Sequence, residues 1–208
     1  MNAVYNKNVT DIDINEIIAL MRFRGGSADE MMETERLVLL PSSNARDLET
    51  YHEHLTTEGD FYYQYGFDMT DDILPKCDFE SNGVVCYTLF LKATGEMTGY
   101  VGLGDRGEGT ANLEFHIFKD HRNKGYCKEA AARYLEAYFN GELSTISGDR
   151  VVAETFFENE ASKAVLLSLG FKSEGIGFRL PSDENENGKI CETLVSYVLE
   201  RKENEKAA

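Results

Sequence analysis

The sequence has no tryptophan, only three prolines, and four cysteines that stand far apart among its 208 residues. No two cysteines form a C-x-x-C pair or show the spacing of a zinc site, so the pattern predicts neither a metal centre nor a redox motif. Free thiols are typical of a reducing compartment, and we therefore expect a cytoplasmic protein without a bound metal. The four cysteines are Cys77, Cys86, Cys127 and Cys191.

Long apolar runs and basic residues are also scarce. No apolar stretch approaches the ~20 residues that cross a bilayer, and residues 1–30 lack the basic start and apolar stretch of a secretion signal. Only 21 basic residues face 37 acidic ones, giving a net charge of −16, which repels phosphate backbones and anionic lipids. We expect no nucleic-acid or membrane partner but a cationic one, unless the acidic surface serves solubility alone.

The residues that are present suit one packed domain. Hydrophobic residues make up 42% and aromatic residues 11% of a chain that is long enough for one core and short for two. We expect an N-terminal extension over residues 1–30 with one helix from Asp11 to Arg24. A domain over residues 31–200 and a charged tail over residues 201–208 follow.

Strand-like and helix-like periodicities alternate along the domain. Thr94-Gly95 between two strand-like runs predicts a hairpin, and the pattern Asn44-x-x-Asp47 predicts a helix start. The glycine-rich run from Gly99 to Gly104 lies within a strand, where glycine marks a bulge or a hairpin end. The order predicts a mixed α/β fold. Expected strands are 36–40, 84–91, 97–103, 113–118, 151–156, 172–178 and 193–199, and expected helices are 44–55, 125–139 and 159–169.

The most specific signal lies where a strand ends in a polar turn and a helix begins near Gly125. The first amides of a helix lack internal partners and carry the positive end of its dipole, and glycine lets a phosphate approach them. Between Lys119 and Lys128, four basic residues stand against one acidic residue. The segment predicts a phosphate site rather than a solvated loop, although neither G-x-G-x-x-G nor G-x-x-x-x-G-K-[ST] occurs.

Arg122-x-x-Gly125-x-Cys127 resembles the R/Q-x-x-G-x-G/A signature of the GNAT superfamily of acetyltransferases. The superfamily's fold is the acyl-CoA N-acyltransferase fold. The resemblance therefore implies a central, mostly antiparallel twisted sheet flanked by helices.

Three further motifs are similar to the branch typified by ribosomal-protein N-terminal acetyltransferases (the Rim-type branch). That branch opens with Thr-Glu-Arg-Leu, here Thr34–Leu37, and carries Asn-x-x-Ser, here Asn159–Ser162. The helix that follows ends in Leu-Gly-Phe, here Leu169–Phe171. The matches occur in order across residues 34–178.

The resemblance implies acetyl-CoA as cosubstrate and assigns its contacts. The amides of residues 122–128 would cradle the CoA diphosphate, and the backbone of Ile117 would pair with the pantetheine arm. Asn159 would contact the pantetheine or β-alanine portion, although asparagine is also a favoured N-cap, and Ser162 would lie near the thioester sulfur. The expected cofactor-binding residues are Ile117, Arg122, Asn123, Lys124, Gly125, Tyr126, Cys127, Lys128, Asn159 and Ser162.

Acetylation of an amine needs a base, because the amine is mostly protonated near neutral pH. In the expected strand, Leu113, Phe115 and Ile117 share one face, and Glu114 and His116 the other. A central strand with helices on both sides should be apolar on both, so a carboxylate and an imidazole there need an explanation. We expect Glu114, ahead of His116, to be the general base. The alternative is that either is a structural group.

The departing CoA thiolate needs a proton as well. Many superfamily members place a tyrosine general acid on the last helix, whereas this chain has Val165-Leu166-Leu167 at the matching positions. We expect protonation by Ser162 or by water.

An aromatic cluster over residues 61–67 is edged by aspartates, and the loop Pro181–Gly188 is acidic too. Aromatic faces with carboxylates suit a cationic amine, although core packing is the commoner fate of aromatic residues. The sequence thus predicts an N-acetyltransferase, monomeric or homodimeric, for a primary amine of a small molecule or a protein N-terminus. The alternative is a non-catalytic CoA-binding sensor or interaction module. The aspartates are Asp60, Asp68, Asp71 and Asp72.

Overall fold

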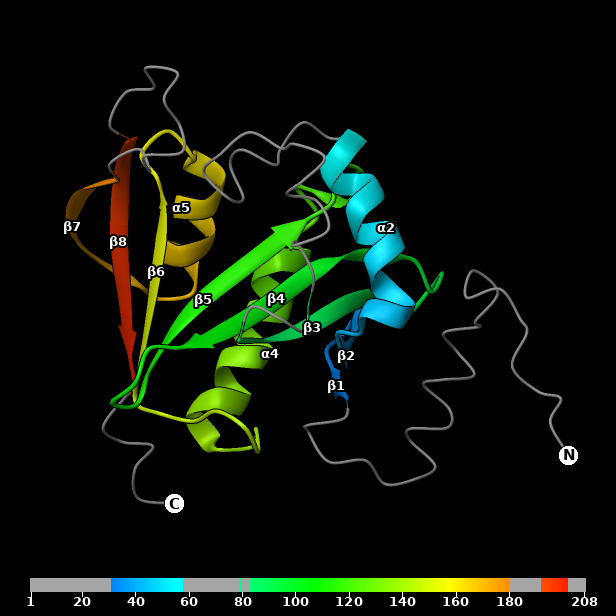
Figure 1. Cartoon of the computed structure of the whole chain (residues 1–208), viewed down its shortest axis with the longest axis horizontal. Helices are drawn as coiled ribbons and strands as arrows, with labels where there is room; N and C mark the ends of the chain where they lie inside the picture. Colours follow the sequence, from blue (N-terminus) through cyan, green and yellow to red (C-terminus); the bar gives the residue numbers. More distant parts are fainter. Residues whose placement is uncertain (1–30, 58–78, 80–82, 180–191, 202–208) are drawn as a thin grey trace, which may run out of the picture.

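The computed structural model describes residues 31–57, 79, 83–179 and 192–201 (Figure 1). Several predictions fall outside the described residues. These are the helix from Asp11 to Arg24, the aromatic segment 61–67 with its aspartates, the acidic loop 181–188, and the charged tail beyond Arg201.

The described residues contain eight strands, three α-helices and one short 3-10 helix. The strands are β1 (Met32–Glu33), β2 (Leu37–Pro41), β3 (Val84–Leu91), β4 (Met97–Asp105), β5 (Thr110–Ile117), β6 (Arg150–Phe156), β7 (Lys172–Arg179) and β8 (Glu192–Glu200). The helices are α2 (Asn44–Thr57), the 3-10 helix η3 (Lys119–His121), α4 (Tyr126–Asn140) and α5 (Glu160–Ser168). All strands and helices predicted in these ranges are present, whereas β1 and η3 are too short to leave a periodic signal.

One sheet contains all eight strands in the order β1-β2-β3-β4-β5-β6-β8-β7. Every neighbouring pair is antiparallel except β5 and β6, which are parallel. The predicted mixed α/β fold with a mostly antiparallel sheet is confirmed. None of the helices in the described ranges is long and apolar enough to cross a membrane.

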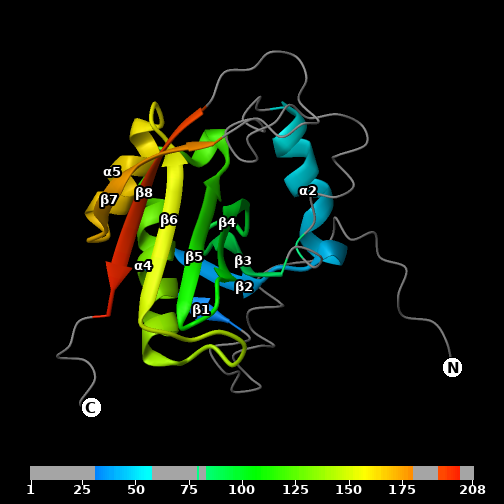
Figure 2. The same ribbon diagram turned by 60° about the vertical axis from the view of Figure 1, so that its left-hand side comes forward.

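Helices cover both faces of the sheet (Figures 1 and 2). The larger core joins α4 and α5, through side chains such as Tyr134 and Leu166, to one face. On the other face, Tyr51 and Leu55 of α2 pack against Cys86, Tyr100 and Phe118. β5 is therefore a central strand with a helical layer on each side, as the site prediction requires.

The start of α2 lies at Asn44, as predicted, and is tied to the sheet. The carboxylate of Asp47, 1% exposed, accepts hydrogen bonds from the amide of Ser43 (3.0 Å) and the hydroxyl of Thr88 (2.6 Å). The amide of Phe79 donates to Asn44 Oδ1 at 2.9 Å. The predicted helix start is confirmed, and the Asp47 carboxylate fixes the helix to β3 through Thr88.

β4 has a bulge directly before its glycine-rich run. Leu89 pairs with Gly99 and Phe90 with Met97, so Thr98 is an extra residue in β4. A Cβ atom on Gly99 would lie 2.0 Å from the carbonyl oxygen of His116 in β5. Only glycine permits this close approach of the two strands, which sets the position of His116.

Candidate active site

The central feature of the site is a divergence of two parallel strands. β5 pairs with β6 only over Thr110–Asn112 and Arg150–Val152. Beyond these residues β5 stays paired with β4 as far as Ile117, and β6 with β8 as far as Phe156. Figure 1 shows the two strands separating toward their carboxyl ends. The divergence leaves one edge of β5 unpaired by β6 in the middle of the sheet.

The backbone of β5 faces that open edge at every second residue. The amide of Phe118 donates to Thr98 in β4 (2.9 Å), so the even-numbered residues bond to β4. Because alternate residues of an antiparallel strand bond in opposite directions, Phe115 and Ile117 direct their backbone groups toward β6. The Ile117 carbonyl already accepts a hydrogen bond from Arg122 Nε at 2.8 Å. The Ile117 amide and both backbone groups of Phe115 therefore face the edge that an extended ligand would pair with.

The turn after β5 presents the amino end of α4. Gly125 is the N-cap residue, with φ +81°, and no side chain caps the helix. Asn123 also has a positive φ, +60°, a conformation that asparagine tolerates better than most residues. The predicted phosphate-binding residues thus form the turn and first helical residues of α4. The first amides of α4 have no helical acceptor, whereas the Arg122 amide donates to the Lys119 carbonyl at 3.3 Å. The residues in question are Arg122, Asn123, Lys124, Gly125, Tyr126, Cys127 and Lys128.

The thiol of Cys127 does not face the predicted phosphate site. Its side chain packs against the larger core, and burial raises the pKa of the thiol to about 12. The thiol is therefore protonated and a poor nucleophile near neutral pH. Because the side chain of Cys127 is compact and lies on the core side, Cys127 contributes only its backbone amide to the turn.

The amino end of α5 follows β6. Asn159 is the N-cap, and its side-chain oxygen accepts the Ser162 amide at 3.1 Å. Because β5 and β6 are parallel neighbours, α4 and α5 both begin at the edge where the strands diverge. The structure therefore brings the two predicted cofactor-binding segments to the same end of the sheet.

Glu114 and His116 lie on the α2 face of β5, as predicted. The imidazole of His116 stacks on Tyr100 with ring centroids 6.3 Å apart, and its side chain is buried. Glu114 pairs with Gly102, which in turn pairs with Cys86. Because Gly102 has no side chain, the carboxylate of Glu114 lies close enough to the Cys86 thiol to raise the pKa of that thiol, although burial is the larger cause.

The environment of Glu114 changes its proton affinity. Burial raises the pKa of the carboxyl above its ordinary value, while the hydrogen bond from Asn112 (3.4 Å) and the charge of Arg106 lower it in part. A half-buried carboxylate with a raised pKa is a stronger base than an exposed one and is the kind of group that abstracts protons. Asn112 and Arg106 were not predicted, because nothing in their sequence context marks them.

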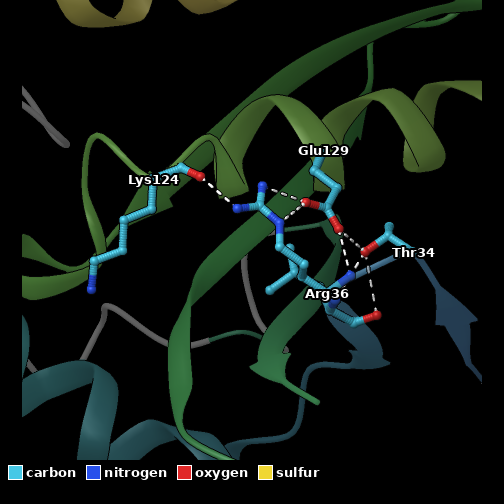
Figure 3. Close-up of polar contacts among 5 residues, drawn as sticks. Thr34, Arg36, Lys124 and Glu129 are labelled. Atoms are coloured by element: carbon cyan, nitrogen blue, oxygen red, sulfur yellow. Dashed lines mark hydrogen bonds and ion pairs between the residues drawn. The ribbon is translucent and has the colours of Figure 1, made fainter. Parts of the chain in front are cut away.

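Three residues that the sequence does not assign to the site contact the α4 turn. Arg36, beside β2, donates from Nη1 to the Lys124 carbonyl at 2.8 Å and places its guanidinium 4.6 Å from the Tyr126 ring centroid. Glu129, in the first turn of α4, binds both Arg36 and Thr34 (Figure 3). The signal for Thr34 and Arg36 was present in the Thr-Glu-Arg-Leu motif, but the motif alone gives no role.

Divergent parallel strands, with a glycine-started helix after one and a capped helix after the other, define the class of acyl-CoA N-acyltransferases. Residues 36–172 match the acetyltransferase (GNAT) domain. The chain belongs to this family, and the predicted superfamily is confirmed.

Curated relatives point the same way over shorter segments. The uncharacterized N-acetyltransferase p20 of Bacillus licheniformis is 26% identical over 117 residues, which are 55% of this chain and 62% of that protein. The uncharacterized N-acetyltransferase YjdG of Bacillus subtilis is 34% identical over 93 residues, 44% of this chain and 53% of that protein. The matches thus span about half to three fifths of the relatives' length.

Solved structures share the fold over most of the chain. An acetyltransferase of Salmonella typhimurium that modifies the N-terminal serine of ribosomal protein L7/L12 superposes with a TM-score of 0.66, at 14% identity over 83% of this chain and 100% of that one. A GNAT-family acetyltransferase of Bacillus anthracis gives a TM-score of 0.64, at 20% identity over 82% and 98% of the two chains.

Proposed function

We propose that the protein transfers an acetyl group from acetyl-CoA to a primary amine, with Glu114 as the general base. The observation that carries the proposal is the position of this carboxylate. It is half-buried, its pKa is raised, and it lies on the strand whose edge and following helix form the expected CoA site. The GNAT domain match supports the reaction class. The relatives' names, N-acetyltransferases, support it as well.

The chain's own groups fit acetyl-CoA. The uncapped amides at the start of α4 would hold the diphosphate, the open edge of β5 would pair with the pantetheine arm, and Asn159 would contact its amides. Bound acetyl-CoA supplies an activated thioester. Glu114 removes the ammonium proton so that the amine can attack, which requires no covalent bond to the protein. Ser162, at the start of α5, or water returns a proton to the thiolate.

We infer that the acceptor is a cationic amine. The net charge of −16 supports this, because an acidic field draws a cation toward the site. One Salmonella typhimurium neighbour is described as acting on a protein N-terminus, and small amines fit the same chemistry. We further propose a cytoplasmic location on the cysteine pattern of the sequence.

A mass-shift screen of amines after addition of acetyl-CoA tests the acceptor class. We expect kcat/KM for the preferred amine to fall as salt is raised, because salt screens the attraction over ~8–10 Å. Amines of similar size whose overall charge is neutral or negative serve as the comparison acceptors. A flat salt response, or preference for an anionic amine, would contradict a cationic acceptor while leaving acetyl transfer intact.

Asn159 has two proposed roles, which one pair of variants separates. Asn159→Ala removes the N-cap and should lower the free energy of unfolding by ~1 kcal/mol in denaturant titration. Asn159→Ser keeps a cap but loses the side-chain amide, so it should remain stable and bind acetyl-CoA more weakly in calorimetry. Unchanged affinity in Asn159→Ser would show that the residue serves as a cap alone.

A further inference from the structure

The α4 turn is held from outside by side chains of a distant segment. The Glu129 carboxylate, whose side chain is only 17% exposed, accepts four contacts. Oε1 accepts the Thr34 hydroxyl (2.5 Å) and the Arg36 amide (2.8 Å), while Oε2 meets Arg36 Nε (2.7 Å) and Nη2 (2.6 Å) (Figure 3). Burial by itself would raise the pKa of this carboxyl, but the donors outweigh it and hold the pKa below its ordinary value. Glu129 is thus ionised and fully engaged.

Arg36 extends this contact to the turn itself. While Nε and Nη2 bind Glu129, Nη1 donates to the carbonyl of Lys124 at 2.8 Å. The planar guanidinium makes both contacts at once, which a single ammonium group does less well. It also lies over the ring of Tyr126, so the residues on either side of Gly125 both touch Arg36.

The contact to Lys124 fixes the direction of the next amide. The described peptide bonds are all trans, so the Lys124 carbonyl and the Gly125 N–H point in opposite directions. By holding the carbonyl, Arg36 aims the Gly125 N–H away from itself, toward the side where a phosphate would be bound. The turn gains from such support, because Asn123 is held at a positive φ of +60° and no side chain caps α4.

The arrangement also affects the charge at the turn. An ionised carboxylate in the first turn of a helix interacts favourably with the positive end of the helix dipole, but it repels a bound phosphate. Arg36 pairs with that carboxylate on two nitrogens and thereby removes the repulsion. Thr34 holds the carboxylate from its other oxygen.

We propose that Thr34, Arg36 and Glu129 form a positioning clamp that sets the α4 turn for the diphosphate of acetyl-CoA. The clamp rests on the proposed function, since it concerns the same cosubstrate. None of its three residues contacts the reacting atoms. The clamp acts on cosubstrate affinity and leaves the chemical step alone.

Arg36→Ala should weaken acetyl-CoA binding in calorimetry about tenfold or more, because a hydrogen bond to a charged group is lost and a carboxylate is uncovered. Turnover of S-acetylpantetheine, which lacks the diphosphate, should stay unchanged. Arg36→Lys keeps the positive charge but loses the planar guanidinium that makes both contacts at once, so it should bind acetyl-CoA more weakly than wild type. Arg150→Ala is the control, because Arg150 is as exposed as Arg36, 43% against 44%, and also pairs with a carboxylate, that of Glu174.

Four outcomes would overturn the clamp. Arg36→Ala could bind acetyl-CoA as tightly as Arg150→Ala does, or Arg36→Lys could restore wild-type affinity, which would make charge alone sufficient. Equal losses with acetyl-CoA and S-acetylpantetheine would show that Arg36 only stabilises the fold. A wild-type protein that binds no acetyl-CoA would overturn the proposed function, and the clamp with it.

Discussion

Replacing Glu114 by glutamine should lower kcat by ~10²–10⁴-fold, the usual cost of losing a general base. The amide has nearly the same shape but cannot take a proton. Acetyl-CoA affinity should stay nearly unchanged, because the side chain lies on the α2 face of β5 and the cosubstrate is expected at its edge. The measurement is steady-state turnover with calorimetry on the same samples.

The pH dependence gives a second readout of the same residue. Burial raises the pKa of the Glu114 carboxyl, and the base must be deprotonated to act. The rate should therefore rise as the pH rises through that elevated pKa, and Glu114→Gln should lose this limb of the profile. Glu136→Gln, on an exposed carboxylate of α4 (62% exposed), is the control. Retained turnover with an unshifted profile would move the role to His116 or to water.

Replacing Gly125 by valine should weaken acetyl-CoA binding by well over tenfold, more than ~1.4 kcal/mol. Gly125 has φ +81°, which a β-branched residue adopts only with strain. Its side chain would also obstruct the approach of a diphosphate to the amides. A Cβ there would lie 3.3 Å from Arg36 Nη2, so the substitution would also crowd the Arg36 side chain of the clamp.

Gly141 provides a matched control at the other end of α4. It has φ +68°, and a Cβ there would meet no atom within 4 Å. Gly141→Val imposes a similar backbone strain far from the expected phosphate, so it should reduce stability and leave the affinity for acetyl-CoA intact. Normal affinity in Gly125→Val would refute the assignment of the phosphate site to the α4 turn.

Local patterns were sufficient to predict most of the fold. The period-two alternation of residues 113–117 correctly places Glu114 and His116 on one face, because neighbouring side chains of a strand point in opposite directions. Gly125 marks the start of α4 for an equally local reason, a positive φ. Such features depend on a few consecutive residues and are therefore visible in one sequence.

Features that depend on distant contacts were not predictable. Thr34 and Glu129 are 95 residues apart, and they meet only because the sheet brings the start of β2 beside α4. The hydrogen bond from the Ser43 amide to Asp47 was not predicted, since burial against Thr88 decides which amide the carboxylate reaches. The divergence of β5 and β6 is likewise a property of their pairing, which neither strand's sequence shows by itself.

The most direct test of acetyl transfer counts both products in one reaction. Purified protein is incubated with acetyl-CoA and a panel of amines, and free CoA and acetylated amine are measured together. We predict equal amounts of the two, growing in proportion to enzyme concentration and far smaller in Glu114→Gln. Binding of acetyl-CoA without release of free CoA for any amine would contradict the account and identify a CoA-binding sensor instead.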